Sequence, residues 1–205
     1  MTDSFYYFMV TNEKDIFGGP HYGTQYDLSA ACPVCGSGAV RQPPIYTKKL
    51  ARSFDLYMTL DYDILFSDKL VAAFRDEEID TFDDVISCKT KEILPYKVLR
   101  SQAELPRFSE KSKGFQREDP CSKCDQDGYF HIPHVPLQLH YRDVNPRLLE
   151  YDVLCTSEKF GRGRLREPIS DSVFARPLYL VSDRFRRCLD SCKVKGYQVQ
   201  LVEME

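Results

Sequence analysis

The stretch PLYLVSDRFRRCLDSCKVKGYQVQLVE, residues 177–203, carries the signals of a strand, a helix and a second strand in succession. An apolar run ends at Ser182, a favoured N-cap residue, and Asp183 places a carboxylate in the first helical turn, where it complements the helix dipole. Four side chains follow the i, i+3, i+4, i+7 spacing of a buried helix face: Phe185, Cys188, Leu189 and Cys192. Polar and apolar residues then alternate from Tyr197 onward, as expected of a closing strand.

A second stretch, YDILFSDKLVAAFRDEEIDTFDDVIS at residues 62–87, repeats this order of signals. Ser67 corresponds to Ser182, and the aromatic residues Phe82 and Tyr197 follow their serines at the same distance. Coincidence is the alternative explanation, because a serine-capped helix after a strand is common. We favour a pseudo-repeat. The sequence therefore predicts an α+β fold of two pseudo-repeated strand–helix–strand units.

Each unit is preceded by a Cys-x-x-Cys pair, which we call a knuckle. The first knuckle, CPVCG, is residues 32–36, and the second, CSKCD, is residues 121–125. The residue after the second cysteine often needs a positive φ, which Gly36 and Asp125 tolerate. Together the knuckles supply the four thiolates that a structural Zn²⁺ prefers: Cys32, Cys35, Cys121 and Cys124. We predict one structural zinc ion in a zinc-ribbon-like node that joins the two units.

Other interpretations of the cysteine pairs are weaker. A thioredoxin-type redox role is less favoured, because neither pair lies between a buried strand and the start of a helix. His131 and His134 are alternative ligands, but Pro133 prevents a helical presentation and thiolates are available. Two dithiols that hold no metal are the remaining alternative. An all-thiolate set leaves no open coordination position, so we expect a structural metal and not a catalytic one.

Length and composition indicate a soluble globular chain. The 205 residues are 42% hydrophobic and 29% charged, which suits one domain spanning residues 1–205. A net charge of −3 gives no general attraction to nucleic acid or to an anionic membrane. Without a membrane span or a secretory signal, we expect a cytoplasmic protein whose eight cysteines are thiols or metal ligands. Polar composition predicts flexible segments at residues 107–119 and 156–172.

Two charged segments are candidate interaction surfaces. Six carboxylates fall within nine residues: Asp76, Glu77, Glu78, Asp80, Asp83 and Asp84. An ordinary solvated surface is the simplest account of this acidic segment, and an interface for a basic protein partner is the alternative. A basic loop carries Lys159, Arg162, Arg164 and Arg166. We favour a surface insertion for this loop over an RNA or phosphate site, because it lacks the flanking strand and helix of a nucleotide-binding loop.

Motifs of catalysis are missing from the sequence. It contains no Gly-x-Ser-x-Gly elbow, no His-Glu-x-x-His pair and no phosphate-binding glycine loop. We therefore do not expect an enzyme.

The two Cys-x-x-Cys pairs and the C-terminal unit at residues 177–203 resemble those of the myxobacterial double-CxxCG motif proteins, a family of immunity proteins against toxins delivered between sibling cells. The resemblance covers most of the chain, although the second knuckle ends in Asp125 where the family has glycine. It implies a cytoplasmic protein that binds and neutralises a cognate protein toxin and has no activity of its own. The acidic segment would complement a basic toxin. The alternative is a zinc-ribbon protein with a nucleic-acid-binding or regulatory function, which would use its knuckles and the basic loop.

Overall fold

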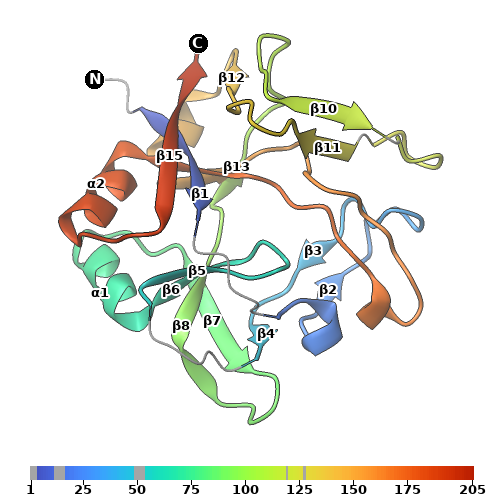
Figure 1. The fold of residues 1–205 in the computed structure, drawn as a ribbon, viewed down its shortest axis with the longest axis horizontal. Helices are drawn as coiled ribbons and strands as arrows, with labels where there is room; N and C mark the ends of the chain where they lie inside the picture. Colours follow the sequence, from blue (N-terminus) through green and yellow to red (C-terminus); the bar gives the residue numbers. More distant parts are fainter. Residues whose placement is uncertain (1–3, 12–16, 49–53, 119, 127) are drawn as a thin grey trace.

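The computed structural model describes residues 4–11, 17–48, 54–118, 120–126 and 128–205. Within them the chain is mostly β, with fifteen strands in four sheets and two α-helices of nine residues each (Figure 1). The predicted α+β class of two strand–helix–strand units is therefore wrong. From the sequence, only the strands that flank the two predicted helices were identified. Most of the others have two to four residues, too few to show an alternating pattern. Four of them also pair with strands that are distant in the chain: β4 (Ile45–Thr47), β9 (Ala103–Glu104), β12 (His140–Tyr141) and β13 (Val153–Cys155).

The larger sheet has six strands in the order β12-β15-β1-β14-β13-β9. Its strands are β1 (Phe5–Val10), β9 (Ala103–Glu104), β12 (His140–Tyr141), β13 (Val153–Cys155), β14 (Tyr179–Ser182) and β15 (Tyr197–Met204). The second sheet has five strands in the order β4-β7-β8-β6-β5. Its strands are β4 (Ile45–Thr47), β5 (Leu56–Met58), β6 (Ile64–Ser67), β7 (Phe82–Ser87) and β8 (Ile93–Leu99).

Two small hairpins and three short 3₁₀ helices complete the described structure. The hairpins pair β2 with β3 and β10 with β11, both antiparallel. Their strands are β2 (Tyr26–Asp27), β3 (Val40–Arg41), β10 (Phe115–Glu118) and β11 (Gly128–His131). The 3₁₀ helices are η1 (Pro20–Tyr22), η2 (Pro146–Glu150) and η3 (Ile169–Asp171). Among the described residues, no helix has the length and apolar character needed to cross a bilayer.

The two helices begin where the sequence predicts. In α1 (Asp68–Asp76) the Ser67 Oγ accepts a hydrogen bond from the Leu70 N–H at 3.2 Å. In α2 (Asp183–Ser191) the Ser182 Oγ accepts one from the Phe185 N–H at 3.1 Å. Both N-cap predictions are confirmed. The buried face of α2 holds three of its four predicted residues; Cys192 instead lies just past the last turn and is exposed.

The two helix starts share a detail that the sequence did not show. The Ser67 hydroxyl donates to Asp55 at 3.0 Å, while its backbone N–H donates to the Asp55 carbonyl at 2.9 Å. The Ser182 hydroxyl donates to Asp152 at 2.7 Å, and its N–H donates to the Asp152 carbonyl at 2.9 Å. Each N-cap serine is therefore fixed by one aspartate of a preceding segment.

In neither unit are the two strands that flank the helix direct neighbours. Strand β8 lies between β6 and β7 and is antiparallel to both. Strand β1 lies between β14 and β15 and is likewise antiparallel to both. The flanking strands are thus parallel to each other and split by a third strand, an arrangement of the split βαβ type. In the C-terminal unit that third strand comes from the opposite end of the chain.

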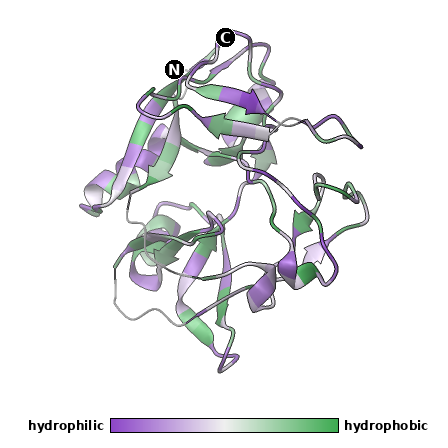
Figure 2. Ribbon diagram, turned by 45° about the vertical axis from the view of Figure 1, so that its right-hand side comes forward, coloured by the Kyte–Doolittle hydropathy of each residue, from purple (hydrophilic) through white to green (hydrophobic). Residues whose placement is uncertain are grey.

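One hydrophobic cluster joins the two large sheets through the helices. It includes Phe8 of β1, Phe66 of β6, Phe74 of α1 and Phe185 of α2, all at most 2% exposed. The Phe74 and Phe185 rings lie 4.4 Å apart between centroids. Further clusters cover the other face of each sheet. The molecule has two parts, one built on the six-stranded sheet with α2 and one built on the five-stranded sheet with α1. Figure 2 shows them one above the other, with the C-terminus on the upper part.

Candidate metal centre

The first knuckle is a tight turn closed by its own backbone. The Gly36 N–H donates to the Cys32 carbonyl at 2.9 Å, and the Cys32 N–H donates to the Ser37 carbonyl at 2.7 Å. Gly36 has a φ of 72°, as predicted, which glycine adopts without steric cost. The Ser37 N–H points at the Cys35 sulfur at 3.4 Å. The turn therefore directs both cysteine side chains to one side and donates a backbone hydrogen bond to one of the sulfurs.

The second knuckle repeats this geometry. The Asp125 N–H donates to the Cys121 carbonyl at 2.9 Å, and the Cys121 N–H donates to the Gln126 carbonyl at 3.0 Å. Asp125 has a φ of 51°, in the left-handed region that aspartate tolerates better than most residues. An aspartate in place of glycine therefore leaves the turn intact.

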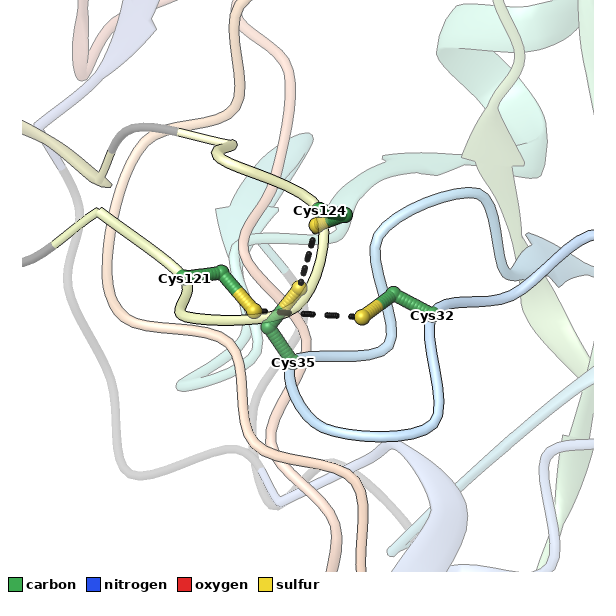
Figure 3. A group of neighbouring side chains, drawn as sticks. All are labelled: Cys32, Cys35, Cys121 and Cys124. Atoms are coloured by element: carbon green, nitrogen blue, oxygen red, sulfur yellow. Dashed lines mark hydrogen bonds between the residues drawn. The ribbon is translucent and has the colours of Figure 1, made fainter.

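The two knuckles face each other, and their four sulfurs converge (Figure 3). The Cys32 and Cys121 sulfurs lie 3.8 Å apart, the Cys35 and Cys124 sulfurs lie 3.6 Å apart, and all four are within 4.8 Å of one another. The cluster joins segments 89 positions apart in the chain. Cys32 and Cys121 are buried, whereas Cys124 lies at the exposed edge of the cluster.

Backbone donors favour the thiolate form at two of the sulfurs. The N–H groups of Cys35 and Val34 lower the pKa of Cys32 to about 6. Those of Lys123 and Cys124 lower the pKa of Cys121 in the same way. Burial raises the pKa of Cys35 to about 12. Since a metal binds the thiolate and not the thiol, the turns prepare one ligand in each knuckle for coordination.

The cluster fits one tetrahedral metal ion. Bonds of about 2.3 Å from Zn²⁺ to four tetrahedral sulfurs would place the sulfurs about 3.8 Å apart, close to the observed separations. All four donors are sulfur, the set typical of Zn²⁺ or of iron–sulfur chemistry. A metal here would be closed off by protein ligands and would tie the two knuckles together. The cysteines are thus brought together as the sequence predicts.

The other candidate ligands lie elsewhere. His131 lies on β11, where its ring packs against Phe160 and Tyr7, and burial lowers its pKa. His134 is exposed in the following turn with a φ of 63°. Within the described chain these four cysteines are the only group of three or more potential ligands gathered within coordination distance.

The acidic segment divides into two parts. Three of its carboxylates form ion pairs within the chain: Asp80 with Arg75, Asp83 with Arg100 and Asp84 with Lys97, at 3.3, 3.3 and 2.8 Å. The other three, Asp76, Glu77 and Glu78, are exposed at the end of α1 and form no ion pair with other described residues. We call these three the acidic tip. Any attraction of a basic partner is therefore concentrated on half of the predicted residues.

The basic loop packs directly on the first knuckle. The Leu165 N–H donates to the Val34 carbonyl at 3.0 Å, and an antiparallel bridge joins Arg164 to Val173. From residue 162 to residue 166 exposed and half-buried positions alternate, so that Arg162, Arg164 and Arg166 are exposed. The sequence did not predict this contact, because nothing in the loop's composition indicates its partner.

A serine–histidine–glutamate arrangement, which sequence reasoning missed, lies at the C-terminal end of β15. The Ser109 Oγ is 2.5 Å from the His140 Nδ1, and the His140 Nε2 is 3.1 Å from a Glu205 oxygen. Hydrogen bonds from Lys111 and His140 lower the pKa of Glu205. The imidazole is only 4% exposed, and its two nitrogens face Ser109 and Glu205. This geometry ties the end of β15 to the segment around residue 110.

Comparison of the chain with protein-family models and with curated proteins finds no match.

Proposed function

We propose that the chain is a zinc-stapled binding protein of the immunity type, which binds and neutralises a protein toxin without a catalytic step. The observation that carries this proposal is the convergence of four cysteine sulfurs from two remote segments. Four protein ligands leave a tetrahedral ion no open position for substrate, so its contribution is to fix the shape of the surface around it. The resemblance of the knuckles and of the C-terminal unit to double-CxxCG immunity proteins supports the toxin-binding part.

The acidic tip supports a basic partner. Three neighbouring exposed carboxylates that form no ion pair with other described residues keep their charge available to an approaching protein. Complementary charge of this kind accelerates encounter and selects among partners more than it adds affinity. The partner that fits this chemistry is a protein with a cationic surface, as many toxins that act on nucleic acid have.

Co-expression tests the neutralising activity directly. The reading frame next to this gene is expressed in a sensitive host with and without the gene itself. We expect growth arrest without it and rescue with it, because an immunity protein and its toxin must be inherited together. If the neighbouring product is harmless when expressed alone, the proposal loses its main support.

Charge neutralisation of the acidic tip is expected to slow binding of that partner. Asp76→Asn, Glu77→Gln and Glu78→Gln together should lower the association rate constant about tenfold at low salt, with little change in dissociation. Surface plasmon resonance at two salt concentrations measures both rates. The matched control removes three exposed carboxylates elsewhere: Glu110, Asp143 and Glu150. Equal slowing in both triple variants would show that total charge matters and that the tip does not.

The alternative function, nucleic-acid binding, is favoured by one observation. Arg162, Arg164 and Arg166 project from a segment that is anchored on the first knuckle. A protein that neutralises three phosphates would lose affinity with a slope of about −2 in log K against log salt for a single strand. Fluorescence anisotropy with a labelled oligonucleotide discriminates the two functions. Under the immunity proposal we expect no measurable binding at physiological salt.

A further inference from the structure

A cleft of about 860 Å³ lies between the metal centre and the ends of strands from the two large sheets. Five parts of the chain line it. They are the first knuckle with β3, residues 62–63 and 83 at the five-stranded sheet, residues 100–104 with 155, the second knuckle with residues 118, 128 and 130, and residues 159–163 with 174–179. Representative lining residues are Val40, Tyr62, Arg100, Lys159, Gly163 and Arg176. The metal centre borders the cleft through Cys35 and Cys121.

Charged groups in the cleft are largely matched with one another. Three ion pairs line it: Arg41 with Asp63, Arg100 with Asp83 at 3.3 Å, and Lys159 with Glu104 at 2.8 Å. Burial is the largest single effect on the pKa of Arg41 and would lower it, but the Asp63 carboxylate together with Tyr179, Tyr26 and Asp83 raises that pKa above its usual value. At these three places a small ion would have to compete with partners already in position.

Three apolar side chains that line the cleft are exposed to solvent. Val34, Val40 and Tyr62 line it and are 48%, 57% and 61% exposed. A polypeptide segment that lies across the cleft can cover all three side chains, and apolar anchors beside charged groups are the usual composition of protein interfaces. The occupant that fits is therefore a protein segment with apolar side chains.

One side of the cleft is formed by residues 160–176, which we call the outer wall. It touches the first knuckle at three contacts. The Leu165 N–H donates to the Val34 carbonyl at 3.0 Å. Gly163 lies so close to the Cys35 carbonyl that any Cβ there would collide with it. At Gly36 a Cβ would come within 2.9 Å of the Phe174 ring. The absence of side chains at the two glycines thus allows the wall and the knuckle to touch.

This wall has little core of its own. From residue 161 to residue 171 no position is buried. A segment with few buried apolar contacts belongs to the least stable part of a fold. Its position therefore depends on the element against which it packs. That element is a turn which a metal would rigidify, since metal binding and folding are coupled in such sites.

We propose that the cleft binds a polypeptide segment of the partner through apolar side chains, and that metal in the first knuckle holds the outer wall, residues 160–176, in place. The inference rests on the proposed function in taking the partner to be a protein. It adds the location of the binding site and the dependence of that site on metal.

The location is tested with peptides selected from a random library on the zinc-loaded full chain. Val40→Arg places a long charged side chain at the cleft and should weaken the selected peptides about tenfold or more, as expected for loss of an interface anchor. Ile93→Arg is the matched control, because Ile93 is 61% exposed on β8 and does not line the cleft. Failure to enrich any peptide, or equal weakening by both variants, would overturn the proposed location.

The metal dependence is tested by hydrogen exchange with mass spectrometry, which needs no partner. Removing the metal with a chelator should speed exchange of amides in residues 160–176 about tenfold, because local opening there becomes easier. Gly163→Ala should do the same in zinc-loaded protein. Gly161→Ala is the control: its Cβ would face open space, although its φ of 90° carries some strain. Unchanged exchange after chelation, or equal effects of the two alanines, would overturn the coupling.

The outcomes separate this inference from the proposed function. A neighbouring gene product that binds the wild-type chain and the Val40→Arg variant equally contradicts the cleft alone. A second outcome is that the selected peptides bind at the cleft while the neighbouring gene product is harmless and does not bind the chain. That result would contradict the immunity function but would support the cleft as a peptide-binding site.

Discussion

Replacement of Cys121 by serine is expected to abolish stoichiometric metal binding and to lower the free energy of unfolding by about 4–5 kcal/mol. The reason is loop closure: the cluster links positions 89 residues apart, and a cross-link of that span restricts the unfolded chain by roughly this amount. For a chain of this size the loss corresponds to a fall in melting temperature of about 10–20 °C. Differential scanning calorimetry of the zinc-loaded protein measures it.

The control for this prediction is Cys192→Ser, which removes an exposed cysteine outside the cluster. It should leave metal content and melting temperature unchanged. Chelation of the wild-type protein should reproduce the destabilisation of Cys121→Ser, and chelation of that variant should add nothing further. A Cys121→Ser protein that melts with the wild type would show that the cluster does not stabilise the fold.

Replacement of Phe185 by alanine should destabilise the protein by about 3–5 kcal/mol, the usual range for a buried phenylalanine. Phe185 is completely buried, and its ring lies 4.4 Å from that of Phe74 and 6.0 Å from that of Phe66. The cavity would open between α1 and α2, where the two large sheets share a core. Urea unfolding followed by circular dichroism gives the free energy.

Phe54→Ala serves as its control, because Phe54 is 37% exposed and should cost about 1 kcal/mol or less. If Phe185→Ala is no worse than Phe54→Ala, the two sheets do not depend on the aromatic cluster. A lower slope of free energy against urea in Phe185→Ala would instead show that the two parts unfold separately.

Local signals in the sequence predicted the parts of the structure that local chemistry determines. A serine before an apolar helical stripe is enough to place an N-cap, and both Ser67 and Ser182 are N-caps. The turn of a Cys-x-x-Cys pair is equally local, and the positive φ of Gly36 and Asp125 follows from it. The meeting of the knuckles was inferred from ligand number alone, because a tetrahedral ion needs four donors.

Features that depend on contacts between distant residues were missed. Strand β1 lies between β14 and β15, but the six residues of β1 contain no pattern that predicts pairing with those two strands. The ion pairs of Asp83 and Asp84 with Arg100 and Lys97 follow from the pairing of β7 with β8, so two of the six carboxylates are neutralised by a strand pairing that the sequence did not reveal. The position of Cys192 was wrong because the helix ends one residue before it.

X-ray absorption at the zinc edge, on protein purified without added metal, shows whether the two knuckles bind one zinc ion together. We expect a signal from about one zinc ion per chain, with four sulfur neighbours at about 2.3 Å and no nitrogen or oxygen ligand bound to the ion. Absence of a zinc signal, or a first shell that contains nitrogen or oxygen in place of sulfur, would contradict a metal bound by both knuckles.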